Sequence, residues 1–207
     1  MLAAAILAAG ESKRMGQPKA LVPFQGSTFV DHLIAATRHP LVGITRVVLG
    51  AGAEGIRASL KVDASWIVVN ADWPTGQLSS IHAAIRSLPA GATEGILVCP
   101  VDHPLISAHL VGQLIAAFDA GGKLIVLPKH RGRRGHPVLF GAAVYEELLA
   151  APLAVGARQV VWNHAAEVME VETEEEGVIL NLNDPETVRK SRSDPSAGVK
   201  QRLRIHE

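Results

Sequence analysis

The chain has 207 residues, with 20 Lys and Arg against 20 Asp and Glu, and a single cysteine. This length suits one compact domain with a substantial core, and the charge balance leaves no overall field to attract nucleic acid or a membrane surface. One cysteine cannot form an intramolecular disulfide, which agrees with a reducing compartment. Every apolar run is shorter than the roughly 20 residues that span a bilayer, and residues 1–9 lack the basic start of a signal peptide. We therefore expect a cytoplasmic protein with no membrane or nucleic-acid partner.

Short apolar runs alternate with amphipathic patterns along the chain. The runs predict strands, and apolar residues spaced three and four positions apart predict helices. The expected strands are 1–7, 20–24, 46–49, 66–69, 95–100, 124–127, 138–140, 167–171 and 178–182. The expected helices are 28–39, 54–60, one through 81–88, 107–120, 145–149, 156–161 and 185–189. This alternation predicts an α/β fold with a three-layer, mostly parallel, Rossmann-like sheet. We expect one domain over residues 1–190 and a basic, flexible tail over 191–207.

The first predicted strand runs into a glycine-containing loop that carries several cations. Backbone N–H groups of such a loop can form a cradle for anions. Small residues at Ala8, Ala9 and Gly10 allow a ligand to approach the main chain closely. Arg14 and Lys19 add positive charge to the same place. The pattern predicts a triphosphate site, and the alternative is an ordinary surface loop with solvated cations.

The loop also carries a family resemblance. Its segment Leu-Ala-Ala-Gly-x-Ser-x-Arg-Met-Gly-x-x-Lys, residues 7–19, resembles the signature of the MobA-like nucleotidyltransferases, and within them the molybdenum cofactor cytidylyltransferases. The likeness extends over about residues 1–189. It implies a Mg²⁺-dependent enzyme that moves a nucleoside monophosphate from CTP to molybdopterin and releases pyrophosphate. A molybdoenzyme apoprotein is a further candidate partner. The resemblance implies nucleotide binding by Leu7, Ala8, Ala9, Gly10, Ser12, Arg14, Met15, Gly16 and Lys19.

A polar, turn-rich loop precedes the helix through residues 81–88. The family places the nucleobase and ribose against this loop, and amide and hydroxyl groups suit the task because they both donate and accept hydrogen bonds. The two serines also suit capping of the helix, so both roles remain open for them. The residues implied in base and ribose binding are Asn70, Gly76, Gln77, Ser79 and Ser80.

Two positions are candidates for a metal site. Asp102 follows the 95–100 strand, at the end where open parallel sheets bind ligands, and it resembles the family's Asp-x-Pro site for Mg²⁺. Asn183 matches the second ligand in an Asn-x-Asn version of the last motif, where Asp184 can either replace it or cap the next helix. His103 is interpreted as a surface or capping residue. The expected catalytic set is Arg14, Lys19 and Asp102.

A second basic loop, residues 130–137, precedes the 138–140 strand. Guanidinium groups match phosphate oxygens well, so this loop can bind the phosphate of an acceptor, although a plain basic hairpin is the alternative. Its sequence resembles the family's Gly-x-x-Gly-His-Pro. Gly-Ala-Arg at 156–158 resembles a cytidylyltransferase feature but lacks the acid that usually precedes it. We assign acceptor binding to Arg134, Gly135, His136 and Pro137.

A second glycine pattern competes with the first. Gly50, Gly52 and Gly55 form Gly-x-Gly-x-x-Gly after the 46–49 strand, and Asp72 stands near the spacing of a ribose-binding acid. This predicts, as an alternative, an NAD(P)-linked oxidoreductase. The expected helix is short and Asp72 lies beyond the next strand, so a tight strand-to-helix turn explains the glycines equally well. A catalytically silent nucleotide-binding chaperone of a molybdoenzyme is the third possibility.

Overall fold

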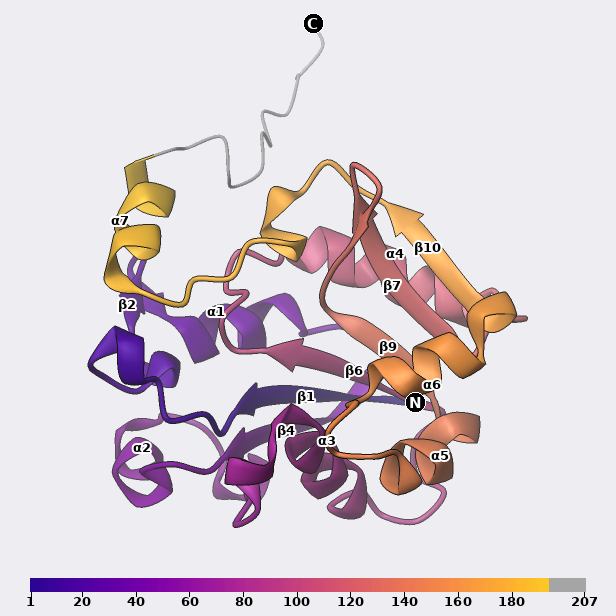
Figure 1. Ribbon diagram of the computed structural model, residues 1–207, viewed down its shortest axis with the longest axis horizontal. Helices are drawn as coiled ribbons and strands as arrows, with labels where there is room; N and C mark the ends of the chain where they lie inside the picture. Colours follow the sequence, from indigo (N-terminus) through magenta and orange to yellow (C-terminus); the bar gives the residue numbers. More distant parts are fainter. Residues whose placement is uncertain (194–207) are drawn as a thin grey trace, which may run out of the picture.

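The computed structural model describes residues 1–193, so most of the expected tail lies outside the described residues. A mixed sheet of eight strands runs through the domain in the order β10-β7-β9-β6-β1-β4-β5, with β8 paired to β7 (Figure 1). Its strands are β1 Leu2–Ala8, β4 Val42–Leu49, β5 Ile67–Val69, β6 Gly95–Pro100, β7 Ile125–His130, β8 Arg133–Arg134, β9 Val138–Gly141 and β10 Val168–Glu172. Strand β9 runs antiparallel to β6 and β7, and β8 antiparallel to β7, whereas the other pairs are parallel. The predicted α/β fold with a mostly parallel sheet is confirmed.

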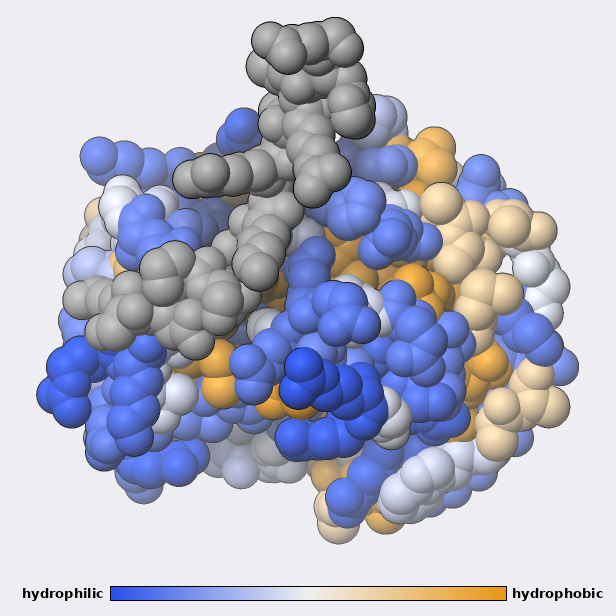
Figure 2. Space-filling model, turned by 90° about the horizontal axis from the view of Figure 1, so that it is seen from above, coloured by the Kyte–Doolittle hydropathy of each residue, from blue (hydrophilic) through white to orange (hydrophobic). Residues whose placement is uncertain are grey.

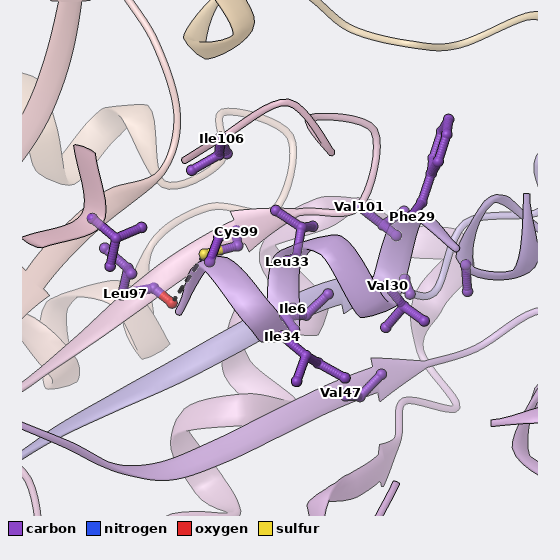
Figure 3. Close-up of a cluster of buried hydrophobic side chains, with 14 of the residues drawn as sticks. Ile6, Phe29, Val30, Leu33, Ile34, Val47, Leu97, Cys99, Val101 and Ile106 are labelled. Carbon is purple, nitrogen blue, oxygen red and sulfur yellow. Dashed lines mark hydrogen bonds between the residues drawn. The ribbon is translucent and has the colours of Figure 1, made fainter. Parts of the chain in front are cut away.

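Helices cover both faces of the sheet. Buried residues of α1 Phe29–Ala36, α2 Ala53–Ser59 and α4 Ala108–Asp119 pack on one face, and those of α3 Gln77–Arg86, α5 Tyr145–Ala150 and α6 Arg158–Asn163 on the other. Successive strand residues point to opposite faces, so Ile6 belongs to the first core cluster and Leu7 to the second. Figure 3 shows Ile34 of α1 pointing toward Val47 of the sheet. The domain therefore has the three expected layers.

Local sequence explains where the helices begin. The Thr28 hydroxyl accepts a hydrogen bond from the Asp31 amide, and the Asp31 carboxylate accepts one from the Thr28 amide, which forms a capping box at α1. The Ser107 hydroxyl accepts from the Leu110 amide at 3.0 Å and caps α4. Ahead of α1, Lys19–Leu21 forms a 3₁₀ turn, η2, and only β2 Pro23–Phe24 is extended, paired with β3 Ser27–Thr28.

The expected strand at 178–182 does not form. A 3₁₀ turn, η7 Glu176–Val178, is followed by an irregular segment up to α7 Pro185–Ser193, and we call residues 176–184 the strap. The Val178 carbonyl accepts from the His136 amide at 2.8 Å, and the Leu182 amide donates to the Asp102 carbonyl at 2.8 Å. The side chains of Val178 and Leu182 are fully buried. This apolar run therefore leaves water by packing against neighbouring loops instead of joining the sheet.

The end of the described chain also departs from expectation. Helix α7 continues to Ser193, beyond the expected end of this helix at residue 189, and Ser191 is buried with its hydroxyl bonded to the Thr187 carbonyl. Within residues 1–193, none of the helices has the length and apolarity needed to cross a bilayer. Figure 2 shows hydrophilic residues over most of the face seen from above, with apolar residues gathered toward the side where β10 and α6 lie in Figure 1.

Candidate functional site

The ends of β1 and β6 bring two predicted site loops together. Leu7 is paired with Pro100 in parallel register, and the Val101 amide donates to the Leu7 carbonyl at 3.1 Å. The loops after these strands therefore start at the same edge of the sheet, which is the edge where parallel sheets bind ligands. This arrangement places Asp102 beside the first glycine loop.

A cavity of about 330 Å³ opens at this edge, and we call it the first cavity. Its walls come from the first glycine loop, the loop before α3 and the end of β6. The lining residues are Leu7, Ala9, Gly10, Ser12, Lys19, Trp73, Pro74, Gly76, Gln77, Ser80, Pro100, Val101 and Asp102. The sequence had not singled out Trp73 and Pro74, although they stand in the turn-rich loop that it assigned to the nucleobase.

The glycine loop is held by a serine at its centre. The Ser12 hydroxyl accepts from the Lys19 amide at 3.1 Å and donates to the Gly10 carbonyl at 3.3 Å. Met15 is buried in the first core cluster and anchors η1 Lys13–Met15. A Cβ atom placed on Gly10 would meet no atom within 4 Å. The Ser12 hydrogen bonds and the buried Met15 thus hold the loop in place, and space remains open beside Gly10.

A lysine, an asparagine and an aspartate meet at the cavity. The Lys19 ammonium lies 2.5 Å from Asn183 Oδ1 and 3.5 Å from Asp102 Oδ2, and the Lys19 and Asp102 side chains are each 19% exposed. The strap brings Asn183 to this place, because the neighbouring Leu182 amide is bonded to the Asp102 carbonyl. Both residues predicted as metal ligands therefore contact the same positive charge.

This pair of oxygens fits a hard cation. Within residues 1–193, no group of three or more His, Cys, Asp and Glu side chains could hold a metal ion by itself. Mg²⁺ commonly binds through one or two carboxylates together with substrate phosphates and water, so it does not need a full protein cage. The Lys19 ammonium is a stand-in cation between Asp102 and Asn183, which indicates that these two oxygens suit positive charge.

Asp184 takes the capping role that the sequence left open. Its carboxylate accepts from the Thr187 amide at 2.9 Å and from the Thr187 hydroxyl at the start of α7. These hydrogen bonds lower the pKa of Asp184, and the Arg14 charge adds a smaller effect in the same direction. Arg14 itself is exposed and is not among the residues that line the first cavity.

The residues assigned to base and ribose divide into two groups. Gly76, Gln77 and Ser80 line the first cavity. Asn70 and Ser79 line a neighbouring groove over β5 and α3. The buried Asn70 amide donates to the hydroxyls of Ser79 at 2.8 Å and Ser80 at 3.1 Å. Asn70 thereby holds the start of α3, and Gly76, not a serine, takes the N-cap position.

The acceptor residues are not brought to one place either. Arg134 is exposed, and its Nε donates to Glu170 Oε1 at 2.7 Å on the far part of the sheet. Gly135 is packed against Val178 of the strap, where a Cβ would come within 2.3 Å of the carbonyl oxygen. The ring of His136 lies instead against that of His103, with 4.9 Å between the ring centroids.

His103 is buried, which corrects its interpretation as a surface residue. Its Nδ1 lies 3.2 Å from the Gly177 carbonyl, which assigns the proton to Nδ1 because a carbonyl only accepts. Burial lowers the pKa of His103, against the opposing effects of the Asp102 charge and the Gly177 hydrogen bond. Burial also lowers the pKa of His136 to about 4, and the His103 charge adds to this effect. Both rings are therefore neutral near pH 7.

The second glycine loop has no free cradle at its first glycine. A Cβ on Gly50 would lie 2.6 Å from the Ala9 carbonyl oxygen and 2.6 Å from Trp73 Cβ. Gly52 adopts φ 65° and starts α2, which has only seven residues. These glycines are explained by a tight turn and by packing on the protein's own Trp73, so a dinucleotide cannot approach the main chain at Gly50.

A mostly parallel sheet with a glycine loop after the first strand, and with a cavity at its carboxyl edge that is lined by Lys19 and Asp102, is an arrangement that suits nucleotide binding. The sequence profile described as the MobA-like NTP transferase domain matches residues 4–168. The chain belongs to this nucleotidyltransferase family.

Relatives and solved structures resemble this chain over most of its length. The chain is 36% identical over 149 residues to nicotine blue oxidoreductase of Paenarthrobacter nicotinovorans, which covers 67% of this chain and 70% of that protein. It is 28% identical over 184 residues to the molybdenum cofactor cytidylyltransferase of Escherichia coli (strain K12), covering 87% and 90%. The crystal structure of Rv0371c from Mycobacterium tuberculosis H37Rv has a TM-score of 0.80 at 22% identity, covering 93% and 98%. Its manganese complex has a TM-score of 0.71 at 21% identity, covering 93% and 98%.

Proposed function

We propose that this protein transfers a cytidylyl group from CTP to the phosphate of a pterin-type acceptor, with Mg²⁺ as the cofactor. The observation that carries the proposal is the meeting of Lys19, Asp102 and Asn183 at the open side of the first glycine loop. The likeness to a molybdenum cofactor cytidylyltransferase over 87% of the chain supports the choice of CTP and of a pterin acceptor.

The first cavity supplies the groups that a triphosphate needs. Its volume of about 330 Å³ is within the range of about 300–1,000 Å³ that is usual for small-molecule sites. The open side of Gly10 allows phosphate oxygens to approach the main chain, and Lys19 provides a positive charge there. Gln77 and Ser80, at the other end of the lining, offer an amide and a hydroxyl to the nucleoside.

Asp102 and Asn183 would hold the Mg²⁺ ion. When bound, the ion supplies positive charge that neutralises the phosphates and the developing negative charge on the leaving group. In the free protein the Lys19 ammonium contacts both oxygens, so metal binding requires this ammonium to move away. A triphosphate at Gly10 offers Lys19 a new partner, and we infer that nucleotide and metal therefore bind together.

The reaction needs no protein base. The acceptor phosphate monoester has a second pKa of about 6, so its oxygen is already ionised near pH 7. That oxygen forms a bond to the α-phosphorus, the bond from the α-phosphorus to the bridging oxygen breaks, and pyrophosphate leaves with the electron pair. The protein contributes positioning and charge stabilisation, which suits a cavity that contains Lys19 and Asp102 but no histidine in its lining.

The test is pyrophosphate release with molybdopterin and each of CTP, GTP and ATP, with and without Mg²⁺. We expect turnover with CTP and Mg²⁺ and its loss when Mg²⁺ is removed by a chelator. Preference for another nucleotide would refute CTP as the donor while preserving nucleotidyl transfer. Nucleotide binding without any turnover would favour the silent chaperone of a molybdoenzyme.

A redox function is the second candidate, because a relative with 36% identity is named nicotine blue oxidoreductase. The second glycine loop offers it little support, since Trp73 and Ala9 occupy the space beside Gly50. Titration with NADH and NADPH, followed by the thermal shift of the protein, separates the candidates. Tight NAD(P)H binding that CTP does not displace would favour the oxidoreductase.

A further inference from the structure

The strap lies against the loop that carries Asp102. This loop, residues 101–107, leads from β6 to α4, whereas the strap leads from the turn after β10 to α7 (Figure 1). Near the end of the strap, the Leu182 amide donates to the Asp102 carbonyl at 2.8 Å. Near its start, the Gly177 carbonyl accepts a hydrogen bond from His103 Nδ1 at 3.2 Å. The two segments are therefore joined at two points.

Glu175, the residue before the strap, adds a charged connection. Its Oε1 accepts from the Ser107 hydroxyl at 2.5 Å, and its Oε2 accepts from the Ser107 amide at 3.3 Å. The Glu175 amide itself donates to the Thr173 hydroxyl at 3.1 Å, which fixes the backbone at this turn. Hydrogen bonds to an ionised carboxylate are stronger than those between neutral groups. Ser107 is also the N-cap of α4, where the helix dipole favours a negative charge.

The other glutamates of this turn do not share the contact. Of the three consecutive glutamates 174–176, only Glu175 is half-buried, whereas Glu174 and Glu176 are exposed. An acidic run is ordinarily a solvated surface, and that explanation suits the two outer members. It does not suit Glu175, because both oxygens of its carboxylate are bonded to the first residue of another element.

Close packing leaves the strap little freedom beside this contact. A Cβ on Gly177 would lie 2.7 Å from Leu105 Cβ and 3.1 Å from the Leu105 carbonyl oxygen. A Cβ on Gly135 would lie 2.3 Å from the carbonyl oxygen of Val178, whose side chain is buried. Packing this dense transmits a displacement to its neighbours instead of absorbing it. A change at the start of the strap should therefore reach its far end.

We propose that Glu175 is a positioning residue for the metal site, because its contact with Ser107 sets where the strap presents Asn183 to Asp102. The inference rests on the proposed function, in which Asp102 and Asn183 hold Mg²⁺. Ser107 follows Asp102 by five residues, and Asn183 follows Glu175 by eight, so the contact ties together the two segments that carry the metal oxygens. Mg²⁺ requires near-ideal octahedral geometry, so a small displacement of one oxygen weakens its binding.

The affinity for Mn²⁺ without nucleotide, measured by electron paramagnetic resonance of the free ion, tests this role without turnover. We expect Glu175→Ala to weaken Mn²⁺ binding about tenfold, as is found when an outer partner of a metal ligand is removed. Glu174→Ala removes the same charge from the adjacent exposed position and should leave the affinity unchanged. Glu175→Gln keeps an oxygen that can accept from the Ser107 hydroxyl, so its affinity should be intermediate.

Asp31→Ala separates positioning from stability. The Asp31 carboxylate at α1 accepts from the Thr28 amide at 3.3 Å and from the Thr28 hydroxyl at 2.6 Å, the same two kinds of contact that Glu175 makes at α4. Both alanine variants should therefore lower the melting temperature, but only Glu175→Ala should weaken Mn²⁺ binding. If Glu175 only supports α4, the melting temperature falls in both variants and Mn²⁺ affinity changes in neither, which contradicts the proposal.

A double variant tests whether Glu175 acts through Ser107. Ser107→Ala removes the hydroxyl that donates to Glu175 and should itself weaken Mn²⁺ binding. The losses of the two single variants should not add in Ser107→Ala/Glu175→Ala, because residues in contact share one interaction. Additive losses would show that the two residues act independently and would overturn their contact as the cause.

Failure of the proposed function gives a different result. Absence of Mn²⁺ binding to the unaltered protein, or equal affinity in Glu175→Ala, would overturn the positioning role. Mn²⁺ binding that Glu175→Ala weakens, together with no pyrophosphate release from CTP by the unaltered protein, would refute nucleotidyl transfer and retain the positioning role.

Discussion

The two glycine loops leave neighbouring parallel strands, yet the surroundings of Gly10 in the first and Gly50 in the second differ. Ala8 at the end of β1 is paired with Leu49 at the end of β4, so Gly10 and Gly50 lie at the same edge of the sheet. Gly10 has open space where a Cβ would stand, whereas Gly50 is closed by Ala9 and Trp73. A glycine allows another group to approach the main chain closely. At Gly50 that group is the protein's own Trp73, whereas at Gly10 the space is open and borders the first cavity.

The charged residues assigned to the two loops also differ in whether they lie at the first cavity. The first loop carries Lys19, whose ammonium meets Asp102 and Asn183. Asp72, the acid proposed to accompany the second loop, is exposed and lines the groove over β5 and α3 instead of the first cavity. Variants of the first cavity can therefore be compared with variants outside it, and their expected effects decrease in the order given below.

The largest difference is expected between the two aspartates. Asp102→Ala should reduce pyrophosphate release by about 10³-fold, because it removes the charged ligand of the metal site. Asp72→Ala should leave the rate unchanged. Steady-state kinetics with CTP and Mg²⁺ measures both, and melting curves establish that the fold survives. Equal rates for Asp102→Ala and the unaltered protein would remove Asp102 from the site.

Two lysines of the first loop give the next contrast. Lys19→Ala should lower the rate of transfer by about 10²-fold, whereas Lys13, exposed and paired with Glu11, can be replaced by alanine without loss of rate.

Lys19→Ala should also bind Mn²⁺ more tightly in the absence of nucleotide, since no ammonium competes for Asp102 and Asn183. Electron paramagnetic resonance of free Mn²⁺ measures this affinity. Weaker Mn²⁺ binding in the variant would contradict the exchange of lysine and metal.

The glycines should show opposite losses. Gly50→Ala forces a Cβ against Trp73 and should lower the free energy of unfolding by about 1–3 kcal/mol while CTP affinity is kept. Gly10→Ala has room in the free protein, so its stability should not change, but CTP affinity should fall roughly tenfold, about 1.4 kcal/mol. Denaturant titration and CTP binding distinguish them. A reversal of the two results would assign the nucleotide to the second loop.

The smallest expected effect is a loss of stability in acid caused by His136, so these variants should be compared near pH 7 or above. The folded protein holds His136 neutral with a pKa of about 4, whereas the unfolded chain binds a proton near pH 6.5, so acid favours unfolding. This contribution to stability levels off about one pH unit above 6.5 and should fall by about 1 kcal/mol between pH 7 and pH 5.5. His136→Phe should remove this part of the slope in urea titrations at the two pH values. An unaltered slope would show that other groups cause the loss.

Several parts of the site could be predicted from the sequence because their signals are local. The strand before the first loop, the small residues at Ala8 to Gly10 and the cation at Lys19 are contiguous, and Asp102 follows an apolar run that ends at the sheet edge. Capping at Thr28 is likewise a short-range pattern. The sequence could not show that Arg134, which it assigned to the acceptor, pairs with Glu170, because Glu170 belongs to a strand that is distant in sequence.

By itself, the sequence determined the alternation of strands and helices, the glycine loop and the membership of a nucleotidyltransferase family, because periodicity and a contiguous motif specify them. Only the tertiary structure decided that Asn183 meets Lys19, which is 164 positions away, and that an apolar run crosses the loops as a strap. It also decided that Trp73 closes Gly50 and that His136 lies unpaired beside an apolar cavity. These facts depend on which distant segments share a space, and no local propensity contains that information.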